Sequence, residues 1–495
     1  MIYRFRFLLL FIFLLPLTGN AQNYCGTTGY SSWLTWYHDN KSELALERGS
    51  DTVWLYVPMT IHFVGTDAGY GYYPKEHAFR IICDLNEQYE DAKIRYYLHP
   101  DQPFMYHANS YWYEHNWDGG SEMIQSTKLP ARVNAYIVAD PAGNCGYSWQ
   151  DAIVMGKGCS GAGNTTWAHE AGHHLSLPHP FFGWEGNDWD FSQPAPQTVN
   201  NGILVERTDT SNCYDAADRF CDTRPDYLSD RWPCNGDQES VAIQKDPDGV
   251  SFRSDASLIM GYAQDVCSSR FTPEQIAAMR SNLQTEHSWY LQTDTPEPDI
   301  PAQAVASLIA PIDTAEVQFN DVTLQWEAVP NAQYYAVQIA IAPGFPFYIY
   351  NTVVENQTTL NITEGLPNNR LLYWRVRPFS DWDVCMDPNQ VQTGIFESRN
   401  LTSTNALERS LLVNLSPNPI ATGVPAQLQI ISDEKLRAQL TIHDVRGRLY
   451  HSEELQLSSG QHQIEINNSE FAAGFYILSL QNEKGAIVKR FVVVE

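Results

Sequence analysis

The distribution of cysteines constrains the fold of this chain more than any other feature of its sequence. The chain has 495 residues and nine cysteines, and eight of these cysteines lie before residue 270. Cysteines at this density are typical of exported proteins, in which they pair as disulfides. We therefore predict that disulfides hold the N-terminal half together. An odd number leaves one thiol unpaired, and spacing alone does not give the pairing.

The first residues also indicate export. Two arginines precede an apolar run that ends in small residues at Gly19 and Ala21, which is the layout of a cleaved signal peptide. A membrane anchor is the alternative, but the run from Phe7 to Leu17 is far shorter than the roughly 20 apolar residues of a spanning helix. No later segment is apolar enough to span a bilayer. The net charge of −27 argues against nucleic acid or an anionic membrane as a partner.

Changes of pattern along the chain predict three folded regions. Strands and helices alternate in the first, which predicts an α+β region with a mixed sheet. The other two alternate in period two, which predicts all-β sandwiches. The boundaries are a signal peptide at 1–21, an N-terminal segment and candidate short propeptide at 22–50, the α+β region at 51–291, a Pro- and acid-rich linker at 292–304, a sandwich at 305–397, a second linker at 398–409 and a second sandwich at 410–495.

Within the α+β region the pattern of apolar residues predicts a strand–helix–strand unit, two more strands and a helix, at 53–64, 76–92, 93–98, 132–139, 151–158 and 165–177. After residue 179 the chain is rich in Gly, Asp and Asn, which indicates long loops held by disulfides. A later helix begins at Thr272, with Pro273 at its first position and Gln275 completing a capping box.

A candidate metal site lies on the predicted helix at 165–177. His169 and His173 are four residues apart, so they project from one face of a helix and can share one metal ion. Glu170 then flanks the metal, where it can take a proton from a water molecule that zinc has acidified. His179 can supply the third ligand if the helix ends after Leu175. His174 is rotated by about 100° from its neighbour, which favours a supporting or surface role.

The run HEAGHHLSLPH at 169–179 resembles the signature H-E-x-x-H-x-x-G-x-x-H of the metzincin zinc metallopeptidases. The resemblance implies a metzincin catalytic domain, which is a mixed twisted sheet with an active-site helix. It implies three histidine ligands, His169, His173 and His179, and Glu170 as general base. Ser176 stands in place of the signature's glycine, where a side chain costs about 1–2 kcal/mol of strain or forces a different turn.

A Met-turn, which metzincins carry beneath the metal, is matched by the run SLIMGY at 257–262. The resemblance implies that Met260 forms an apolar floor and that Tyr262 donates its hydroxyl to the oxyanion of the reaction intermediate. Within the metzincins the chain is most similar to the pappalysin or cytophagalysin branch, on the runs CDTRP at 221–225 and FTPEQ at 271–275. The proline after the last histidine is instead typical of serralysins, but their Gly/Asp nonapeptide repeats are absent from the sequence.

The sequence leaves open the cleavage specificity, the binding of calcium and the mechanism of latency. The pappalysin-like branch cuts beside basic residues, and Asp265 is the carboxylate after the Met-turn that could select them; capping of the turn or exposure to solvent is the alternative. Acidic loops make calcium a second candidate metal, through Asp188, Asp190, Asp246 and Asp248. Cys25 lies close to the mature N-terminus, where it could cap zinc as a thiolate, although the compartment favours a plain disulfide.

The two predicted sandwiches have resemblances of their own. Residues 305–397 resemble a fibronectin type III domain through Trp326, Tyr335 and the run at 373–376. Residues 410–495 resemble the C-terminal sorting domain of the Bacteroidetes type IX secretion system. That resemblance rests on the runs SPNP at 416–419, DVRGR at 444–448, GFYIL at 474–478 and KRFV at 489–492. A plain adhesive sandwich is the alternative for this last region.

Together these features predict a secreted or surface-attached zinc endopeptidase, exported through the periplasm of a Gram-negative bacterium. Its partners would be protein or peptide substrates and the type IX secretion machinery. The alternative is a surface adhesin or glycan-binding protein whose metal domain has lost activity. The intact Glu170 favours the peptidase, because a binding relic has no reason to keep a base beside the metal.

Overall fold

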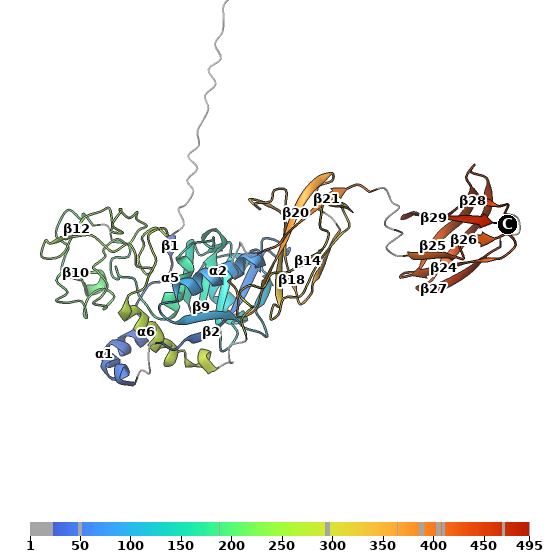
Figure 1. Cartoon of the computed structure of the whole chain (residues 1–495). Helices are drawn as coiled ribbons and strands as arrows, with labels where there is room; N and C mark the ends of the chain where they lie inside the picture. The colour runs from blue at the N-terminus through green and yellow to red at the C-terminus, as the bar shows by residue number, and fades with distance from the viewer. Residues whose placement is uncertain are drawn as a thin grey trace, which may run out of the picture.

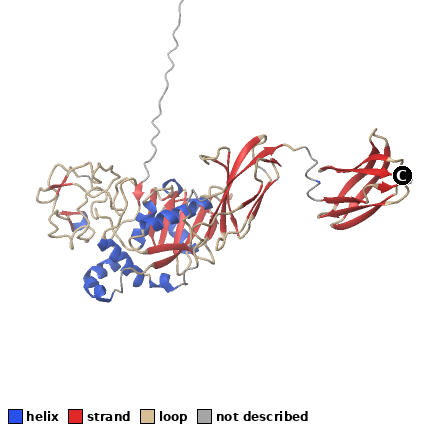
Figure 2. Cartoon of the chain, viewed as in Figure 1, coloured by secondary structure: helices blue, strands red, loops and turns tan. Residues whose placement is uncertain are grey.

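The computed structural model describes residues 23–47, 52–187, 189–292, 298–363, 365–385, 391–401, 407, 411–467 and 471–494. The predicted signal peptide lies outside these residues. Helices gather around the first sheet, and the C-terminal part of the molecule is built from strands (Figures 1 and 2). This mixture confirms the prediction of an α+β fold. No helix among the described residues is both long and apolar enough to cross a membrane.

A seven-stranded mixed sheet forms the centre of the N-terminal region, with strand order β1-β8-β9-β6-β2-β3 and with β4 also paired to β2. Only the pairing of β8 with β9 is antiparallel within this sheet. Ten of the eleven residues of β2 are buried, as is typical of a parallel strand covered on both faces. The strands are β1 (Asn23–Cys25), β2 (Leu55–Gly65), β3 (Ile94–Leu98), β4 (Phe104–Ala108), β6 (Val133–Val138), β8 (Asn144–Trp149) and β9 (Ala152–Gly156).

The predicted strand–helix–strand unit is confirmed as β2, α2 (Lys75–Gln88) and the parallel strand β3. The predicted helix at 165–177 is α5 (Thr166–His174), which packs against β8 and β9. The capping box of Thr272 and Gln275 is confirmed at the start of α6 (Pro273–Gln284). The other elements of this region are α3 (Ser110–Tyr113), β5 (Glu114–His115), α4 (Trp117–Thr127), β7 (Asp140–Pro141), η1 (Lys157–Cys159) and η3 (Ser288–Gln292).

The N-terminal segment at 22–50 is more ordered than the sequence indicated, since it forms β1 and α1 (Ser32–Glu47). β1 lies parallel to β8 at the edge of the main sheet. Its three residues are too few to show a period in the sequence. β8 itself was also missed, because it is interrupted by Gly146 and carries few branched apolar residues.

Long loops between residues 175 and 272 carry little regular structure, as predicted. Their short elements are β10 (Thr198–Val199), η2 (Asn200–Gly202), β11 (Ile203–Leu204), β12 (Gln244–Lys245) and β13 (Ser251–Phe252). Two disulfides hold them, Cys213–Cys221 and Cys234–Cys267, and a third, Cys145–Cys159, joins β8 to the turn before α5. These bridges confirm the prediction of a disulfide-linked N-terminal half.

Two of the nine cysteines depart from the sequence-based expectation. Cys83 of α2 pairs with Cys385, so one disulfide leaves the N-terminal half and reaches the region at 305–397. Cys25 is the unpaired cysteine and is buried. The preference for a disulfide at Cys25 was therefore wrong.

The region at 305–397 is built from a three-stranded sheet, β14-β16-β19, and a five-stranded sheet, β15-β21-β20-β17-β18. Residues of both sheets share one buried cluster, which includes Trp326 and Trp374. The strands are β14 (Leu308–Ala310), β15 (Ala315–Gln318), β16 (Val322–Trp326), β17 (Tyr334–Ala340), β18 (Tyr348–Glu355), β19 (Thr359–Ile362), β20 (Arg370–Phe379) and β21 (Thr393–Arg399). The finer resemblance to fibronectin type III stays a prediction.

The C-terminal region repeats this arrangement, with a three-stranded sheet β22-β24-β27 and a five-stranded sheet β23-β29-β28-β25-β26 around a separate core. Its strands are β22 (Leu411–Ser416), β23 (Ile420–Ala421), β24 (Ala426–Ser432), β25 (Leu436–Asp444), β26 (Leu449–Leu457), β27 (Gly460–Ile466), β28 (Gly474–Asn482) and β29 (Gly485–Val494).

Candidate metal centre

The end of α5 brings the third predicted histidine back toward the first two. The helix ends at His174, and Ser176 adopts a left-handed conformation with φ +73°. Of the two outcomes considered from the sequence, the structure shows the strained turn and not a different one. The Ser176 hydroxyl accepts a hydrogen bond from Asn282 Nδ2 at 3.1 Å, which ties the turn to α6.

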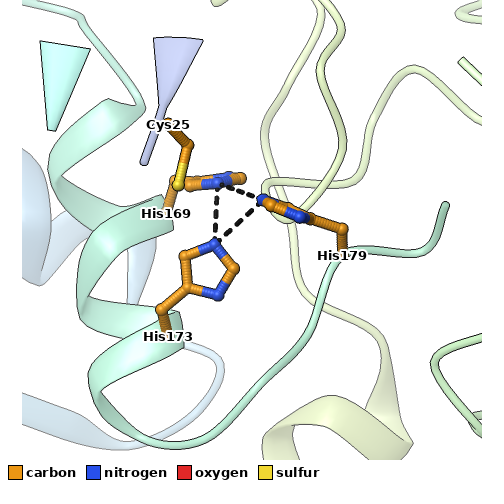
Figure 3. A group of neighbouring side chains, drawn as sticks. All are labelled: Cys25, His169, His173 and His179. Carbon is orange, nitrogen blue, oxygen red and sulfur yellow. Dashed lines mark hydrogen bonds between the residues drawn. The ribbon is translucent and has the colours of Figure 1, made fainter. Parts of the chain in front are cut away.

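Three imidazole nitrogens meet at one point, as Figure 3 shows. The Nε2 atoms of His169, His173 and His179 lie 3.0–3.2 Å from one another. His169 Nδ1 lies 2.8 Å from the Ile259 carbonyl oxygen and His173 Nδ1 lies 2.7 Å from that of Leu177. A carbonyl only accepts, so the proton of each of these two rings is on Nδ1 and its Nε2 presents a lone pair.

The donor set fits a zinc ion. Lone pairs that face one another at about 3 Å repel unless a cation lies between them. A tetrahedral zinc with bonds of about 2.0–2.1 Å separates its ligand nitrogens by about 3.3 Å, close to the observed spacing. Burial lowers the pKa of His169 and His173 well below the ordinary value, so both rings are neutral, as ligation requires. His179 Nδ1 lies 3.3 Å from Glu185 Oε1, and a carboxylate behind a ligand histidine fixes the orientation of its ring.

Glu170 is fully buried beside these histidines. Its Oε2 accepts a hydrogen bond from the Thr27 hydroxyl at 3.1 Å, whereas its Oε1 has no hydrogen-bond partner. Burial raises the pKa of Glu170 to about 8, and the nearby Cys25 and Thr27 oppose that rise. A Cβ on Gly146 would come within 3.0 Å of Glu170 Cγ, so the glycine in β8 leaves room for this carboxylate.

The Cys25 side chain lies beside the three histidines (Figure 3). Its Sγ and one nitrogen of each of the three rings lie within 4.8 Å of one another. The Thr27 backbone N–H donates to this sulfur at 3.2 Å. The Tyr262 hydroxyl donates to the Cys25 carbonyl oxygen at 3.4 Å. The N-terminal segment thus lies against both the three histidines and the Tyr262 hydroxyl.

Met260 packs against α5 at Gly172, between the first two histidines of that helix. It is fully buried, and a Cβ on Gly172 would overlap its sulfur. The residue before it, Ile259, supplies the carbonyl that orients His169. His174 points elsewhere: its Nε2 lies 3.2 Å from the Tyr290 hydroxyl, and its ring stacks on His287. This position agrees with the supporting role predicted for His174.

Asp265 lies near the site but is already paired. Its Oδ2 lies 3.1 Å from Arg231 Nη2, and its Oδ1 accepts from the Thr165 hydroxyl at 2.7 Å. The Arg231 guanidinium also lies 3.9 Å from the centroid of the Tyr24 ring. The predicted selection of basic residues by Asp265 stays untested, and this pairing argues against it, because Arg231 offsets the negative charge.

Of the acidic residues proposed from the sequence for calcium, the three that the structure describes do not form a group with metal-ligand spacing. Asp188 lies outside the described residues, Asp190 bonds the backbone of Ser192, and Asp248 pairs with Arg207. Asp246 accepts from Thr208 and from backbone N–H groups of its own loop. Because protein donors already hold these three carboxylates, the described residues give no support to the predicted calcium site.

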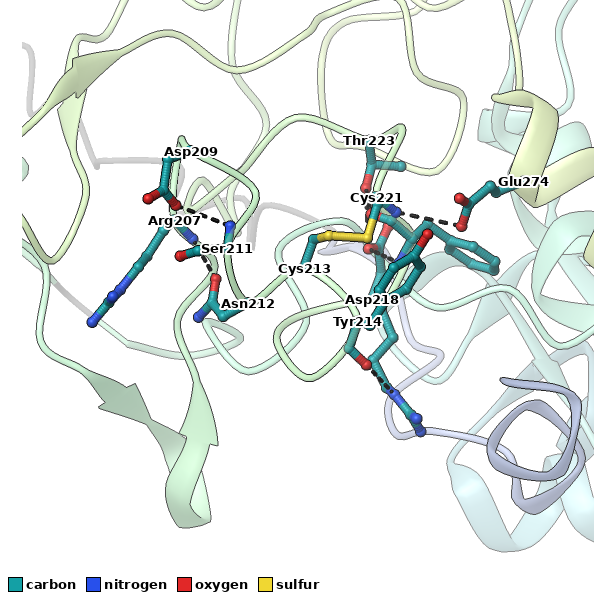
Figure 4. Close-up of a disulfide and its surroundings, with 12 residues drawn as sticks. Arg207, Asp209, Ser211, Asn212, Cys213, Tyr214, Asp218, Cys221, Thr223 and Glu274 are labelled. Atoms are coloured by element: carbon teal, nitrogen blue, oxygen red, sulfur yellow. Dashed lines mark hydrogen bonds between the residues drawn. A yellow bond between two sulfur atoms is a disulfide. The ribbon is translucent and has the colours of Figure 1, made fainter. Parts of the chain in front are cut away.

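A different acidic pair has unsatisfied oxygens. Glu206 and Asp218 are 1% exposed, and both Glu206 carboxylate oxygens and Asp218 Oδ2 have no hydrogen-bond partner. Burial raises the pKa of both carboxyls, that of Glu206 to about 10, and each is affected by neighbouring carboxylates. Thr223 donates to Asp218 Oδ1 at 3.1 Å, next to the Cys213–Cys221 disulfide (Figure 4).

The sequence did not predict several residues that lie around the histidines or in the buried acidic pair. They are Glu185, Thr27, Tyr24, Arg231, Glu206 and Asp218. They lie in loops or in the N-terminal segment, where no periodicity marks a residue as buried. Glu185 alone had a usable signal, since it follows His179 by six residues in an aromatic-rich turn.

Comparisons with known proteins bear mainly on the C-terminal region. Residues 414–494 match the family described as "Secretion system C-terminal sorting domain". This match confirms the sorting domain predicted at 410–495 and indicates a secreted or surface-attached protein. No curated protein matches the chain significantly.

Solved structures give weaker likenesses. A promirolysin mutant from Tannerella forsythia is 16% identical with a TM-score of 0.38, and the match covers 55% of this chain and 97% of that one. The BSP domain of a biofilm associated protein is 12% identical with a TM-score of 0.16, over 37% and 29% of the two chains. A beta-glucosidase from Listeria innocua in complex with glucose is 16% identical with a TM-score of 0.14, over 17% and 16%. These TM-scores are too low to bear on fold or function.

Proposed function

We propose that this chain is a secreted zinc-dependent endopeptidase of the metzincin type, with a pappalysin- or cytophagalysin-like catalytic region. The observation that supports it most is the meeting of three Nε2 atoms beside a buried carboxylate. His169, His173 and His179 would hold the metal, and Glu170 lies next to it with one free oxygen. A purely structural zinc site has no need of an unpaired carboxylate beside it.

The residues around the metal have distinct roles in this proposal. Bound zinc would acidify a water molecule to a pKa of about 7 and polarise the substrate carbonyl. Glu170 accepts the proton of the attacking water on a carboxylate oxygen and delivers it to the leaving nitrogen. Tyr262, whose hydroxyl donates to the Cys25 carbonyl, would donate in the same way to the substrate's oxyanion. Met260 supports α5 from below.

Cys25 would keep the enzyme latent until the N-terminal segment leaves. A thiolate on the open side of the three histidines would fill the position that water needs. The Tyr262 hydroxyl is hydrogen-bonded to the Cys25 carbonyl, and the Glu170 carboxylate is hydrogen-bonded to the Thr27 hydroxyl. One short segment therefore blocks the metal position, Tyr262 and Glu170. Removal of residues 22–28 would release them together.

Zymography with casein or gelatin tests the proposed activity. Wild-type protein should clear the gel, and both a chelator and the substitution Glu170→Ala should abolish clearing. Glu90→Ala removes an exposed carboxylate in a turn and is the matched control, which should clear like wild type. Equal clearing by wild type and Glu170→Ala would refute the peptidase.

Metal analysis tests the ligand set without activity. The secreted protein should contain one tightly held zinc, and His179→Ala should lose most of it while its circular dichroism stays unchanged. His174→Ala is the matched control, because His174 has the same chemistry one residue beyond a ligand but faces Tyr290. Full zinc occupancy in His179→Ala would exclude His179 as a ligand.

Calcium is the second proposed metal, and its place is the pair of Glu206 and Asp218. Buried carboxylates without donors are strongly unfavourable unless they are protonated or bind a cation. Calcium prefers oxygen ligands, and this pair supplies carboxylate oxygens, with Asp218 in the loop that the Cys213–Cys221 disulfide closes. The proposed export route is the type IX machinery, reached through the periplasm and engaged by the sorting domain at 414–494.

A further inference from the structure

Tyr24 occupies an enclosed position beside the candidate metal centre. Its side chain is only 8% exposed, although it belongs to the short edge strand β1. The ring packs edge-on against His169, with centroids 5.2 Å apart, and against Tyr262, with centroids 5.0 Å apart. The Arg231 guanidinium lies on its remaining side, 3.9 Å from the ring centroid. We call these three enclosing side chains, together with Thr165, the Tyr24 site.

The Tyr24 site adjoins the position of the reacting bond. Tyr24 is covalently next to Cys25, whose sulfur faces the three histidines and whose carbonyl oxygen accepts from Tyr262. A peptide that replaced the N-terminal segment, with its scissile carbonyl in the place of the Cys25 carbonyl, would put the side chain of the preceding residue where the Tyr24 ring lies. The site therefore receives the second residue on the N-terminal side of the cleaved bond.

The chemistry of the site favours an aromatic ring over a cation. The His169 and Tyr262 rings stand steeply to the Tyr24 ring, and the Arg231 guanidinium lies over it. This arrangement suits an aromatic side chain, because T-shaped ring pairs are favourable and the face of an aromatic ring attracts a cation. The carboxylate of Asp265, next to Arg231, is held by Arg231 at 3.1 Å and by the Thr165 hydroxyl at 2.7 Å. An incoming Arg or Lys would meet the positive Arg231 before it met a free carboxylate.

We propose that the Tyr24 site selects an aromatic residue at the second position on the N-terminal side of the cleaved bond, and that Arg231 is the residue that determines this specificity. The proposal rests on the proposed peptidase function for its substrate, but the geometry of the site is independent of it.

The first test measures the site without catalysis. Cys25 is the one unpaired cysteine, so the rate at which a coloured disulfide reagent modifies the full-length chain reports how often the N-terminal segment detaches. Tyr24→Phe should react within about threefold of wild type, because the ring contacts remain. Tyr24→Ala and Tyr24→Arg should react at least about tenfold faster, because the ring contacts and its apolar burial are lost.

A double substitution separates the role of Arg231 from general loosening. Tyr24→Arg combined with Arg231→Ala should react more slowly than Tyr24→Arg alone, because Asp265 is then free to pair with the new arginine. Tyr24→Arg combined with Arg224→Ala is the matched control and should not slow, since Arg224 pairs with Glu239 away from the site. A Tyr24→Arg chain as slow as wild type would overturn the proposal.

The second test reads specificity directly, with a peptide library analysed by mass spectrometry. Wild-type enzyme should cut mainly peptides with Tyr or Phe at this second position, and Arg231→Ala should lower that preference about three- to tenfold and raise the share of Arg and Lys there. A wild-type profile dominated by basic residues at this position would overturn the proposal. Absence of any hydrolysis by zinc-loaded enzyme would refute the peptidase function instead, and the modification rates would still decide the aromatic site.

Discussion

At the scale of single residues, Ser176 shows how the third histidine is delivered. A φ of +73° is easy for glycine and strained for serine, yet the chain keeps serine and uses its hydroxyl to accept from Asn282. We predict that Ser176→Gly is more stable than Ser176→Ala by about 1 kcal/mol, because both lose the hydroxyl and only glycine relieves the backbone. Urea unfolding of the two variants measures the difference. Equal stabilities would show that the turn carries no strain.

Cys25 gives a second prediction at this scale. Cys25→Ser leaves the segment nearly isosteric but replaces a soft thiolate ligand with a poor one. Freshly secreted Cys25→Ser protein should hydrolyse casein without the lag that we expect of wild type before its N-terminal segment is removed. Thr28→Ser, a change of one methyl group in the same segment, serves as control and should keep the lag. A lag of the same length in Cys25→Ser would place latency elsewhere.

At the scale of elements, the sequence predicted the parts whose pattern is periodic or whose chemistry is local. The unit β2-α2-β3, the helix α5 and the capped start of α6 all followed from apolar spacing and capping residues. His169, Glu170 and His173 were selected from helical spacing and His179 from the expected end of the helix, and the structure brings the three histidines together. What the sequence did not predict depends on contacts between distant segments, such as β1 beside β8 and Arg231 against Tyr24.

The buried pair of Glu206 and Asp218 also depends on contacts that the sequence did not predict. It gives a testable prediction about calcium and pH. Folding raises the pKa of Glu206 from 4.5 to about 10, so the contribution of this carboxyl to the stability of the calcium-free protein is fully present below about pH 4 and is lost as the pH rises toward 10. Calcium binds the ionised pair and should therefore raise the melting temperature more at pH 8 than at pH 5.

Thermal melts after removal of adventitious metal, with and without added calcium, measure this effect at both pH values. Glu206→Gln with Asp218→Asn should abolish the response to calcium and most of the pH dependence. Asp190→Asn is the matched control from the acidic loops, and it should respond like wild type because Asp190 is exposed and bonded to its own turn. A calcium response that survives the double substitution would place the ion elsewhere.

At the scale of the whole molecule, the sorting domain has a hydrophobic core of its own and contributes no residue to the candidate metal centre. Its core contains only residues from 407 onward, and no residue of the candidate metal centre belongs to it. A chain that ends at about residue 408 should therefore fold and bind zinc but remain inside the producing cell. Immunoblots of cells and medium, with zinc analysis of the retained protein, test both parts. Normal secretion of the shortened chain would refute the sorting role.

The sandwich at 305–397 differs from the sorting domain, because its contacts continue the core of the first region. Phe379 stacks on Phe79 with centroids 4.4 Å apart, and Trp382 stacks on Tyr97 with centroids 3.8 Å apart. Tyr334, Ala336 and Phe379 belong to the same buried cluster as the main sheet. The Cys83–Cys385 disulfide crosses this contact. The stretch at 292–304 therefore joins two packed bodies.

A chain that ends at residue 292 keeps every residue of the candidate metal centre but would expose Phe79 and Tyr97, both fully buried in the complete protein. Each exposed aromatic ring costs about 2 kcal/mol, a large part of the stability of an ordinary domain. We predict that this chain melts at least about 8 °C below the chain that ends at residue 408, or is recovered only as aggregate. Differential scanning calorimetry of the two shortened chains, each with Cys83→Ser to remove the effect of the disulfide, makes the comparison. Equal melting temperatures would mean that the first region folds without the sandwich, and that the aromatic stacking between them contributes nothing to its stability.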